Sequence, residues 1–62
     1  LAFIVNGTLN SRLHVEFDED WGAKWLEIRD CQGHLVHKER VEFLAGFHRI
    51  AIPACGIASI YE

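Results

Sequence analysis

The chain has 62 residues, half of them hydrophobic, and a net charge of −3 at pH 7. Its six basic residues are scattered rather than gathered in a stripe, which disfavours nucleic-acid binding, and no apolar run approaches the roughly 20 residues that a membrane-spanning helix requires. We therefore expect one globular domain, residues 1–62, which is small enough to need a dense core, a covalent link or a neighbouring domain for stability. The chain starts at Leu1 and contains no methionine, so we expect it to be a part of a larger protein or a processed chain.

Apolar and polar residues alternate along most of the chain, a period that predicts half-buried antiparallel strands rather than helices. The expected strands cover residues 1–5, 8–17, 23–30, 34–44, 47–52 and 57–61, and the fourth of them can be one bent strand or two short ones. Six or seven short strands of this kind predict an all-β antiparallel sandwich or a partly open barrel.

The turns between these strands have their own signals. Asn6-Gly7 is a strong two-residue hairpin signal and predicts that the first two strands pair; the same asparagine opens an Asn-Gly-Thr glycosylation sequon. The stretch "DCQG" predicts a turn with Gly33 in the left-handed conformation. Ala45-Gly46 predicts another turn, and Pro53 ends the strand before it because proline cannot donate to a ladder.

The apolar positions of these strands give an expected core. Its members are Phe3, Val5, Leu13, Val15, Phe17, Leu26, Ile28, Val36, Phe43, Ile50, Ile52, Ile57 and Ile60.

The second half of the chain carries a recurring β-module pattern. "LEIRDCQGHLV" has the form of a strand, a turn and a return strand, "LAGFHRIAIP" that of the strand that follows, and "ACGIASI" that of a closing strand. The pattern resembles the immunoglobulin-like modules at the C-termini of secreted bacterial proteins, among them type IX sorting domains and the sandwich of the flagellar hook-capping protein. Its last part also resembles the closing strand of glycosidase C-terminal β-domains. The chain differs from the sorting domains at Ala58, where they usually carry an aromatic residue. The resemblance implies an immunoglobulin-like sandwich and a non-catalytic accessory or sorting module, secreted or on the cell surface.

Two cysteines, Cys31 and Cys55, each fall at an expected turn. A bridge between them would close a loop of about 25 residues and contribute about 3.5 kcal/mol in the chain-entropy model. Two free buried thiols, a metal site or a catalytic thiol are the alternatives at this stage.

The aromatic residues are the main functional signal. Trp21 and Trp25 flank Gly22, Trp25 falls on the strand face opposite Leu26, and Tyr61 ends the last strand. Exposed aromatic side chains stack on sugar rings and form the energetic centres of protein interfaces. The alternative for both tryptophans is packing in the core or against a neighbouring domain.

Residues for catalysis or metal binding are not suggested by this pattern. His34 and His37 lie three apart and would point to opposite faces of a strand, whereas His37 and His48 could face each other on paired strands. The sequence lacks the two closely spaced pairs of cysteine or histidine ligands that zinc sites usually have. We therefore expect no enzyme activity, no cofactor and no metal. The expected partner is an adjacent domain of the parent chain or another protein, with carbohydrate as the alternative.

Overall fold

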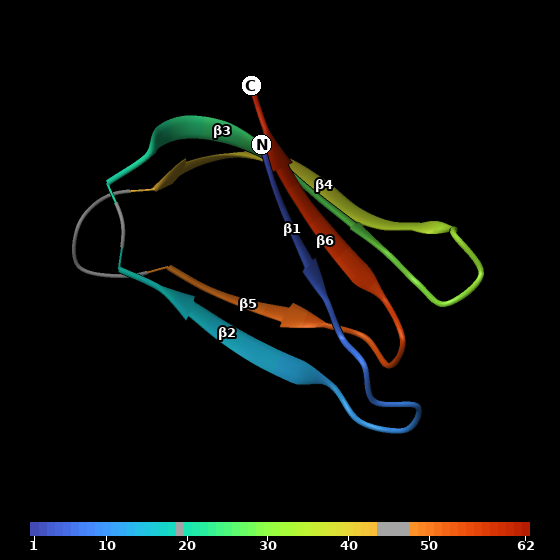
Figure 1. Cartoon of the computed structure of the whole chain (residues 1–62). Helices are drawn as coiled ribbons and strands as arrows, with labels where there is room; N and C mark the ends of the chain where they lie inside the picture. The colour runs from blue at the N-terminus through green and yellow to red at the C-terminus, as the bar shows by residue number, and fades with distance from the viewer. Residues whose placement is uncertain (19, 44–47) are drawn as a thin grey trace.

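The computed structural model describes residues 1–18, 20–43 and 48–62. Within them the chain forms six strands and no helix (Figure 1), which confirms the all-β expectation. The strands are β1 (Ala2–Val5), β2 (Leu13–Phe17), β3 (Gly22–Arg29), β4 (Leu35–Phe43), β5 (His48–Ile52) and β6 (Ile57–Tyr61). The expected turn at Ala45-Gly46 lies outside the described residues.

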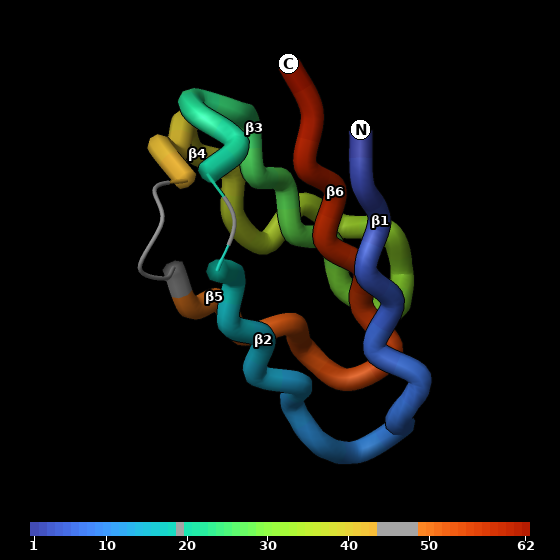
Figure 2. The backbone as a smooth tube through the Cα atoms, turned by 60° about the vertical axis from the view of Figure 1, so that its left-hand side comes forward, coloured from blue at the N-terminus to red at the C-terminus, as the bar shows by residue number. Residues whose placement is uncertain are grey.

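The strands build two antiparallel sheets that face each other (Figures 1 and 2). The larger sheet has the order β1-β6-β3-β4, and the smaller one consists of β2 and β5. All the pairings within the described ranges are antiparallel. Because the two sheets are not joined by pairing among the described residues, the arrangement is an open two-layer fold rather than a closed barrel.

The expected hairpin at Asn6-Gly7 is wrong. β1 pairs with β6 in the larger sheet, and β2 pairs with β5 in the smaller one, so the segment from residue 6 to residue 12 crosses from one sheet to the other. The strand expected over residues 8–17 accordingly starts only at Leu13. The hairpin signal fails here because the side chain of Asn6 is used inside the fold instead of at a turn tip.

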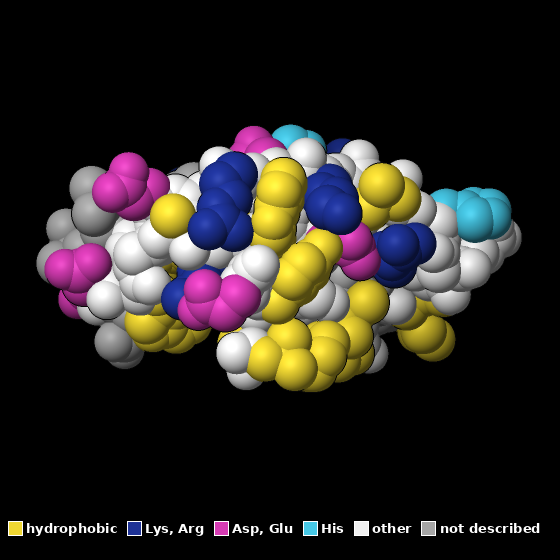
Figure 3. Space-filling model, turned by 90° about the horizontal axis from the view of Figure 1, so that it is seen from above, with side chains coloured by type: hydrophobic (Ala, Val, Ile, Leu, Met, Phe, Trp, Pro, Cys, Tyr) yellow, Lys and Arg dark blue, Asp and Glu magenta, His cyan; other side chains and the backbone are white. Residues whose placement is uncertain are grey.

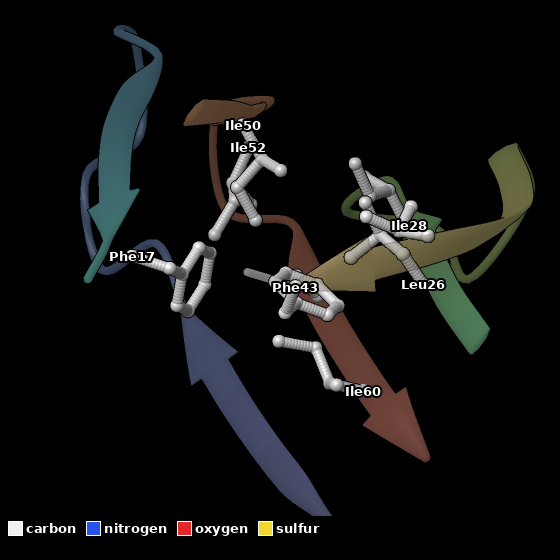
Figure 4. Packing of buried hydrophobic residues seen from close by; sticks show 9 residues of the cluster. Phe17, Leu26, Ile28, Phe43, Ile50, Ile52 and Ile60 are labelled. Carbon is white, nitrogen blue, oxygen red and sulfur yellow. The ribbon is translucent and has the colours of Figure 1, made fainter. Parts of the chain in front are cut away.

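The core lies between the two sheets, where β2 and β5 point their apolar side chains at the larger sheet (Figure 4). Seven of the expected core residues are buried there: Phe17, Leu26, Ile28, Phe43, Ile50, Ile52 and Ile60. Leu13 and Val15 pack against this cluster while remaining partly buried. Phe17 meets Phe43 edge to face, with ring centroids 5.4 Å apart, a favoured aromatic geometry.

Four other expected core residues are not part of the core. Phe3 is 60% exposed, Val5 63% and Val36 55%, and Ile57 is half-buried on the opposite side of its strand from the core. Val41 and Ala58 are buried instead. The error at β1 follows from its composition: a strand that is apolar at every position does not reveal which of its two faces is buried.

Asn6 is the one buried polar residue among the described part of the chain, at 1% exposure. Its Nδ2 group donates to the carbonyl oxygens of Ser11 at 2.9 Å, Ile52 at 3.1 Å and Pro53 at 3.0 Å. Its Oδ1 atom accepts from the backbone N–H and the hydroxyl of Thr8. One carboxamide therefore ties the end of β1 to the end of β5 and to the entry of β2. It also occupies the nitrogen that glycosylation of the sequon would use.

The turn between β5 and β6 is hydrogen-bonded to the segment that follows Asn6. β5 ends at Ile52, just before Pro53 as expected. Cys55 has a φ of 46°, and its N–H donates to the carbonyl of Thr8 at 2.8 Å. A Cβ on Gly56 would lie 2.6 Å from the carbonyl oxygen of Arg29, so glycine is required here by close backbone approach rather than by a left-handed conformation.

The same turn reaches the β3–β4 hairpin through the cysteines. The sulfur atoms of Cys31 and Cys55 lie at disulfide-bonding distance, with the Cα atoms 4.9 Å apart. The hairpin has the expected "DCQG" turn, with Gly33 at a φ of 84°. Asp30 closes that turn by accepting the backbone N–H of His34 at 2.9 Å, a hydrogen bond that lowers the pKa of Asp30.

Removal of the cysteine pair is predicted to destabilise the fold. With a sequence separation of 24, the double variant Cys31→Ser/Cys55→Ser should lose about 3.5 kcal/mol of unfolding free energy in the chain-entropy model, as measured by urea denaturation. Mass spectrometry after alkylation provides the check on the bond itself. The bond is contradicted if both thiols are alkylated without a reductant.

Asn6→Ala is predicted to cost about 2–4 kcal/mol of unfolding free energy, because it leaves buried carbonyls without donors. Asn10→Ala is the matched control, since Asn10 is exposed in the same segment and its loss should cost no more than about 0.5 kcal/mol. Urea denaturation of both variants measures the difference. Equal stabilities of the two variants would show that the Asn6 carboxamide does not hold the sheets together.

Candidate interaction face

The outer face of the larger sheet, turned away from β2 and β5, carries a set of apolar side chains. Successive residues of a strand point to opposite faces. Because Leu26 and Ile28 of β3 and Ala58 and Ile60 of β6 are buried in the core, their neighbours in sequence face outward. The apolar side chains among these neighbours form one group with Phe3 and Val5 of β1, which lie opposite outward-facing residues of β6. We call this group the outer apolar band, and it comprises Phe3, Val5, Trp25, Ile57 and Tyr61.

The strand register brings these five side chains together. Trp25 of β3 lies opposite Tyr61 of β6, Val5 of β1 lies opposite Ile57, and Phe3 lies opposite Ser59. Directly opposed and diagonal side chains on one face of a sheet are within contact range. Figure 3 shows the result from above: hydrophobic side chains gather in the middle of this face, flanked by charged ones. Phe3 and Val5 make up its exposed end, while the other three members are half-buried.

Two cations flank the Trp25 end of the band. The Nζ of Lys38 lies 5.2 Å from the Trp25 ring centroid, and the Cζ of Arg40 lies 5.6 Å from it. Arg40 stands directly opposite Trp25 in the β3–β4 ladder. These are cation–π distances, so the indole ring already has cationic partners on this face.

The Glu27 carboxylate on the same face contacts Arg29, Tyr61 and Lys38. It accepts from the Arg29 Nε and from the Tyr61 hydroxyl, each at 3.1 Å, and lies 3.9 Å from the Lys38 Nζ. The hydrogen bond from Arg29 is the main cause of a lowered Glu27 pKa, followed in the same direction by that from Tyr61, with partial burial opposing both. Glu27 is therefore ionised at neutral pH and fixes the hydroxyl end of Tyr61.

Trp21 is separate from the other two aromatic residues that the sequence singled out. Its ring packs on Phe17 and Phe43, with centroids 5.5 and 5.6 Å away, and it remains 36% exposed at the end of the core. The structure thus brings Trp25 and Tyr61 together but not Trp21. The sequence does not predict the outward position of Phe3 and Val5, because their uniformly apolar stretch offers no signal of its buried face other than the position of Asn6.

Several titratable side chains elsewhere form pairs. The Nε2 of His37 lies 2.9 Å from an oxygen of Glu39 on the same strand, beside a hollow of about 360 Å³ between β4 and β5 that Leu26, Ile28 and Ile50 also line. In the described part of the chain, no group of three or more histidine, cysteine or acidic side chains lies close enough together to hold a metal ion. With their sulfurs bonded, the cysteines would offer no thiolate for catalysis or zinc. The expected approach of His37 to His48 involves a side chain outside the described structure.

Comparisons with known proteins give no relative: no family model, curated protein or solved structure matches the chain. The resemblance to immunoglobulin-like modules therefore remains a prediction. Among the described residues, no helix is long and apolar enough to cross a membrane.

The pKa of Glu27 supplies a prediction for acid stability. A carboxylate whose folded pKa lies below its ordinary value of 4.5 stabilises the fold above that value, and the contribution is lost as pH falls through the folded pKa. Arg29→Gln should therefore raise the Glu27 pKa and reduce the loss of stability on acidification. Carboxyl NMR titration measures the pKa directly. Arg49→Gln is the control, because Arg49 pairs with Glu16 on the smaller sheet, and an equal rise of the Glu27 pKa in both variants would contradict the assignment.

Proposed function

We propose that the chain is a non-catalytic accessory module that binds another protein through the outer face of its larger sheet. The observation that carries the proposal is the outer apolar band, whose end at Phe3 and Val5 is exposed to 60% and 63%. A large apolar patch with a polar rim is typical of an interaction site, and aromatic anchors beside arginine are typical of the energetic centre of an interface.

The charges on this face indicate what the partner carries. Three cations (Arg29, Lys38 and Arg40) and two carboxylates (Glu27 and Glu42) occupy outward-facing positions of β3 and β4, a sum of +1, while the whole chain has a charge of −3. Since complementary charge supports specific docking, the occupant we propose is a protein surface with apolar and acidic side chains. It belongs to an adjacent domain of the parent protein or to a separate protein.

The finer assignments rest on the same features. Two facing antiparallel sheets support an immunoglobulin-like module of the accessory or sorting kind. A bridge between Cys31 and Cys55 fits the oxidising environment of a secreted or cell-surface protein, because such bonds stabilise small domains there.

Carbohydrate binding is the second candidate, favoured by the adjacent rings of Trp25 and Tyr61 on a sheet face. Two contacts weigh against it. Lys38 and Arg40 lie over the Trp25 ring, where a sugar would stack, and the Tyr61 hydroxyl already donates to Glu27.

The test is selection of random displayed peptides on the immobilised chain. Binders should be rich in acidic and apolar residues, and Arg40→Glu should weaken them about tenfold, an effect typical of an interfacial charge. Arg12→Glu changes the net charge equally at an exposed position just before β2 and should leave binding nearly unchanged. Equal losses in the two variants would contradict the proposal.

A second pair of variants separates the apolar contact from the charge. Phe3→Ser should abolish binding of the same peptides. Leu9→Ser removes an apolar side chain in the crossing segment that is more exposed still, 83% against 60%, and should leave binding nearly unchanged. Soluble polysaccharides provide the remaining comparison. A tryptophan emission shift on their addition that disappears in Trp25→Ala would favour the carbohydrate function over the protein one.

A further inference from the structure

The two sheets have outer strands with no further strand paired on their open side among the described residues. β1 and β4 are the outer strands of the larger sheet, and β2 and β5 form the smaller sheet by themselves. An open edge is a template for pairing with another strand, and proteins usually block such edges with charged side chains, proline or bulges.

Three of these edge strands carry such protection. β4 has the charged run Lys38, Glu39, Arg40 together with Glu42, and its register with β3 shifts between Ile28 and Arg29. β2 and β5 carry the ion pair between Glu16 and Arg49.

β1 has none of these devices. Its four residues, Ala2–Val5, are all apolar and include no charge and no proline. Phe3 and Val5 project outward and are more than half exposed. In Figure 2, β1 runs along the margin of the molecule, next to β6 on one side only.

We propose that β1 is a self-association edge, which pairs antiparallel with β1 of a second copy of the chain and joins two four-stranded sheets into one. Antiparallel pairing of identical strands is compatible with a twofold axis, because the contact of one residue with a second residue of the other copy is repeated with the two copies exchanged. The occupant is a second copy because both paired strands would then be uncharged. Pairing through the other edges would bring charged side chains together, in molecules that each have a net charge of −3.

The pairing also extends the apolar surface. Phe3 and Val5 of both copies would lie on the same outer face, so that the two outer apolar bands become continuous. A ladder of four residues per copy buries little area, and interfaces at the small end of the size range are weak. We expect a dissociation constant on the order of 100 µM.

Sedimentation of the chain alone tests the proposal, with no partner protein present. Between about 10 µM and 1 mM, a range that brackets the expected constant, the average mass should rise from monomer towards dimer. Val5→Lys should raise the dissociation constant at least about tenfold, because lysine on an edge opposes strand pairing. Val36→Lys makes the same change on β4 at a site of similar exposure, 55% against 63%, and should associate like the unmodified chain.

Amide hydrogen exchange distinguishes edge pairing from stacking of the outer faces. In the dimer, β1 amides that point away from β6 should exchange more slowly as concentration rises. The proposal is overturned by a monomer at all concentrations, by a Val5→Lys variant that associates normally, or by β1 amides that gain no protection. None of these results would contradict the proposed peptide binding. Self-association is measured without a partner protein and with a Val5 variant, whereas the charge test of peptide binding uses an Arg40 variant.

Discussion

The Asn6 carboxamide is the interaction on which the two-layer arrangement depends. A domain of this size buries only about 60% of the surface of its unfolded chain, and the smaller sheet contributes just β2 and β5 to the core. Asn6 fixes both layers at one end, because it holds the carbonyls of Ile52 and Pro53 after β5 and that of Ser11 before β2. The turn at Cys55 extends the same connection to the β3–β4 hairpin through Cys31. Apolar packing fills the space between the sheets, but this polar contact sets how they meet.

The buried asparagine also decides which side of β1 faces out. Asn6 follows directly after Val5 and points inward, and its backbone N–H continues the pairing toward β6 by donating to the Gly56 carbonyl at 3.0 Å. With alternating faces along a strand, an inward Asn6 requires Ile4 inward and both Val5 and Phe3 outward. A structural requirement at one residue thus exposes the side chains on which the proposed binding face and the proposed self-association edge both depend.

How much was predictable from the sequence differs between the middle and the start of the chain. β3 alternates clearly, so the sequence correctly predicts the inward positions of Leu26 and Ile28, the placement of Trp25 on the opposite strand face, and the Gly33 turn. The strand predicted over residues 1–5 agrees closely with β1 at Ala2–Val5, but the predicted buried face and the predicted neighbouring strand are wrong. Its pairing with β6 is a contact between the two ends of the chain, which local turn propensity at Asn6-Gly7 cannot reveal. The cation contacts of Trp25 likewise depend on the register with β4.

The proposed binding face requires that Phe3 and Val5 of β1 point outward while Ile4 faces the core. NMR relaxation by a soluble paramagnetic agent measures this directly, since protons near the surface relax faster than buried ones. The Val5 methyl groups and the Phe3 ring should relax several-fold faster than the methyl groups of Ile4 and Ile60. Faster relaxation of Ile4 than of Val5 would mean that β1 has the opposite phase, and it would contradict both the binding face and the account of Asn6 from which it follows.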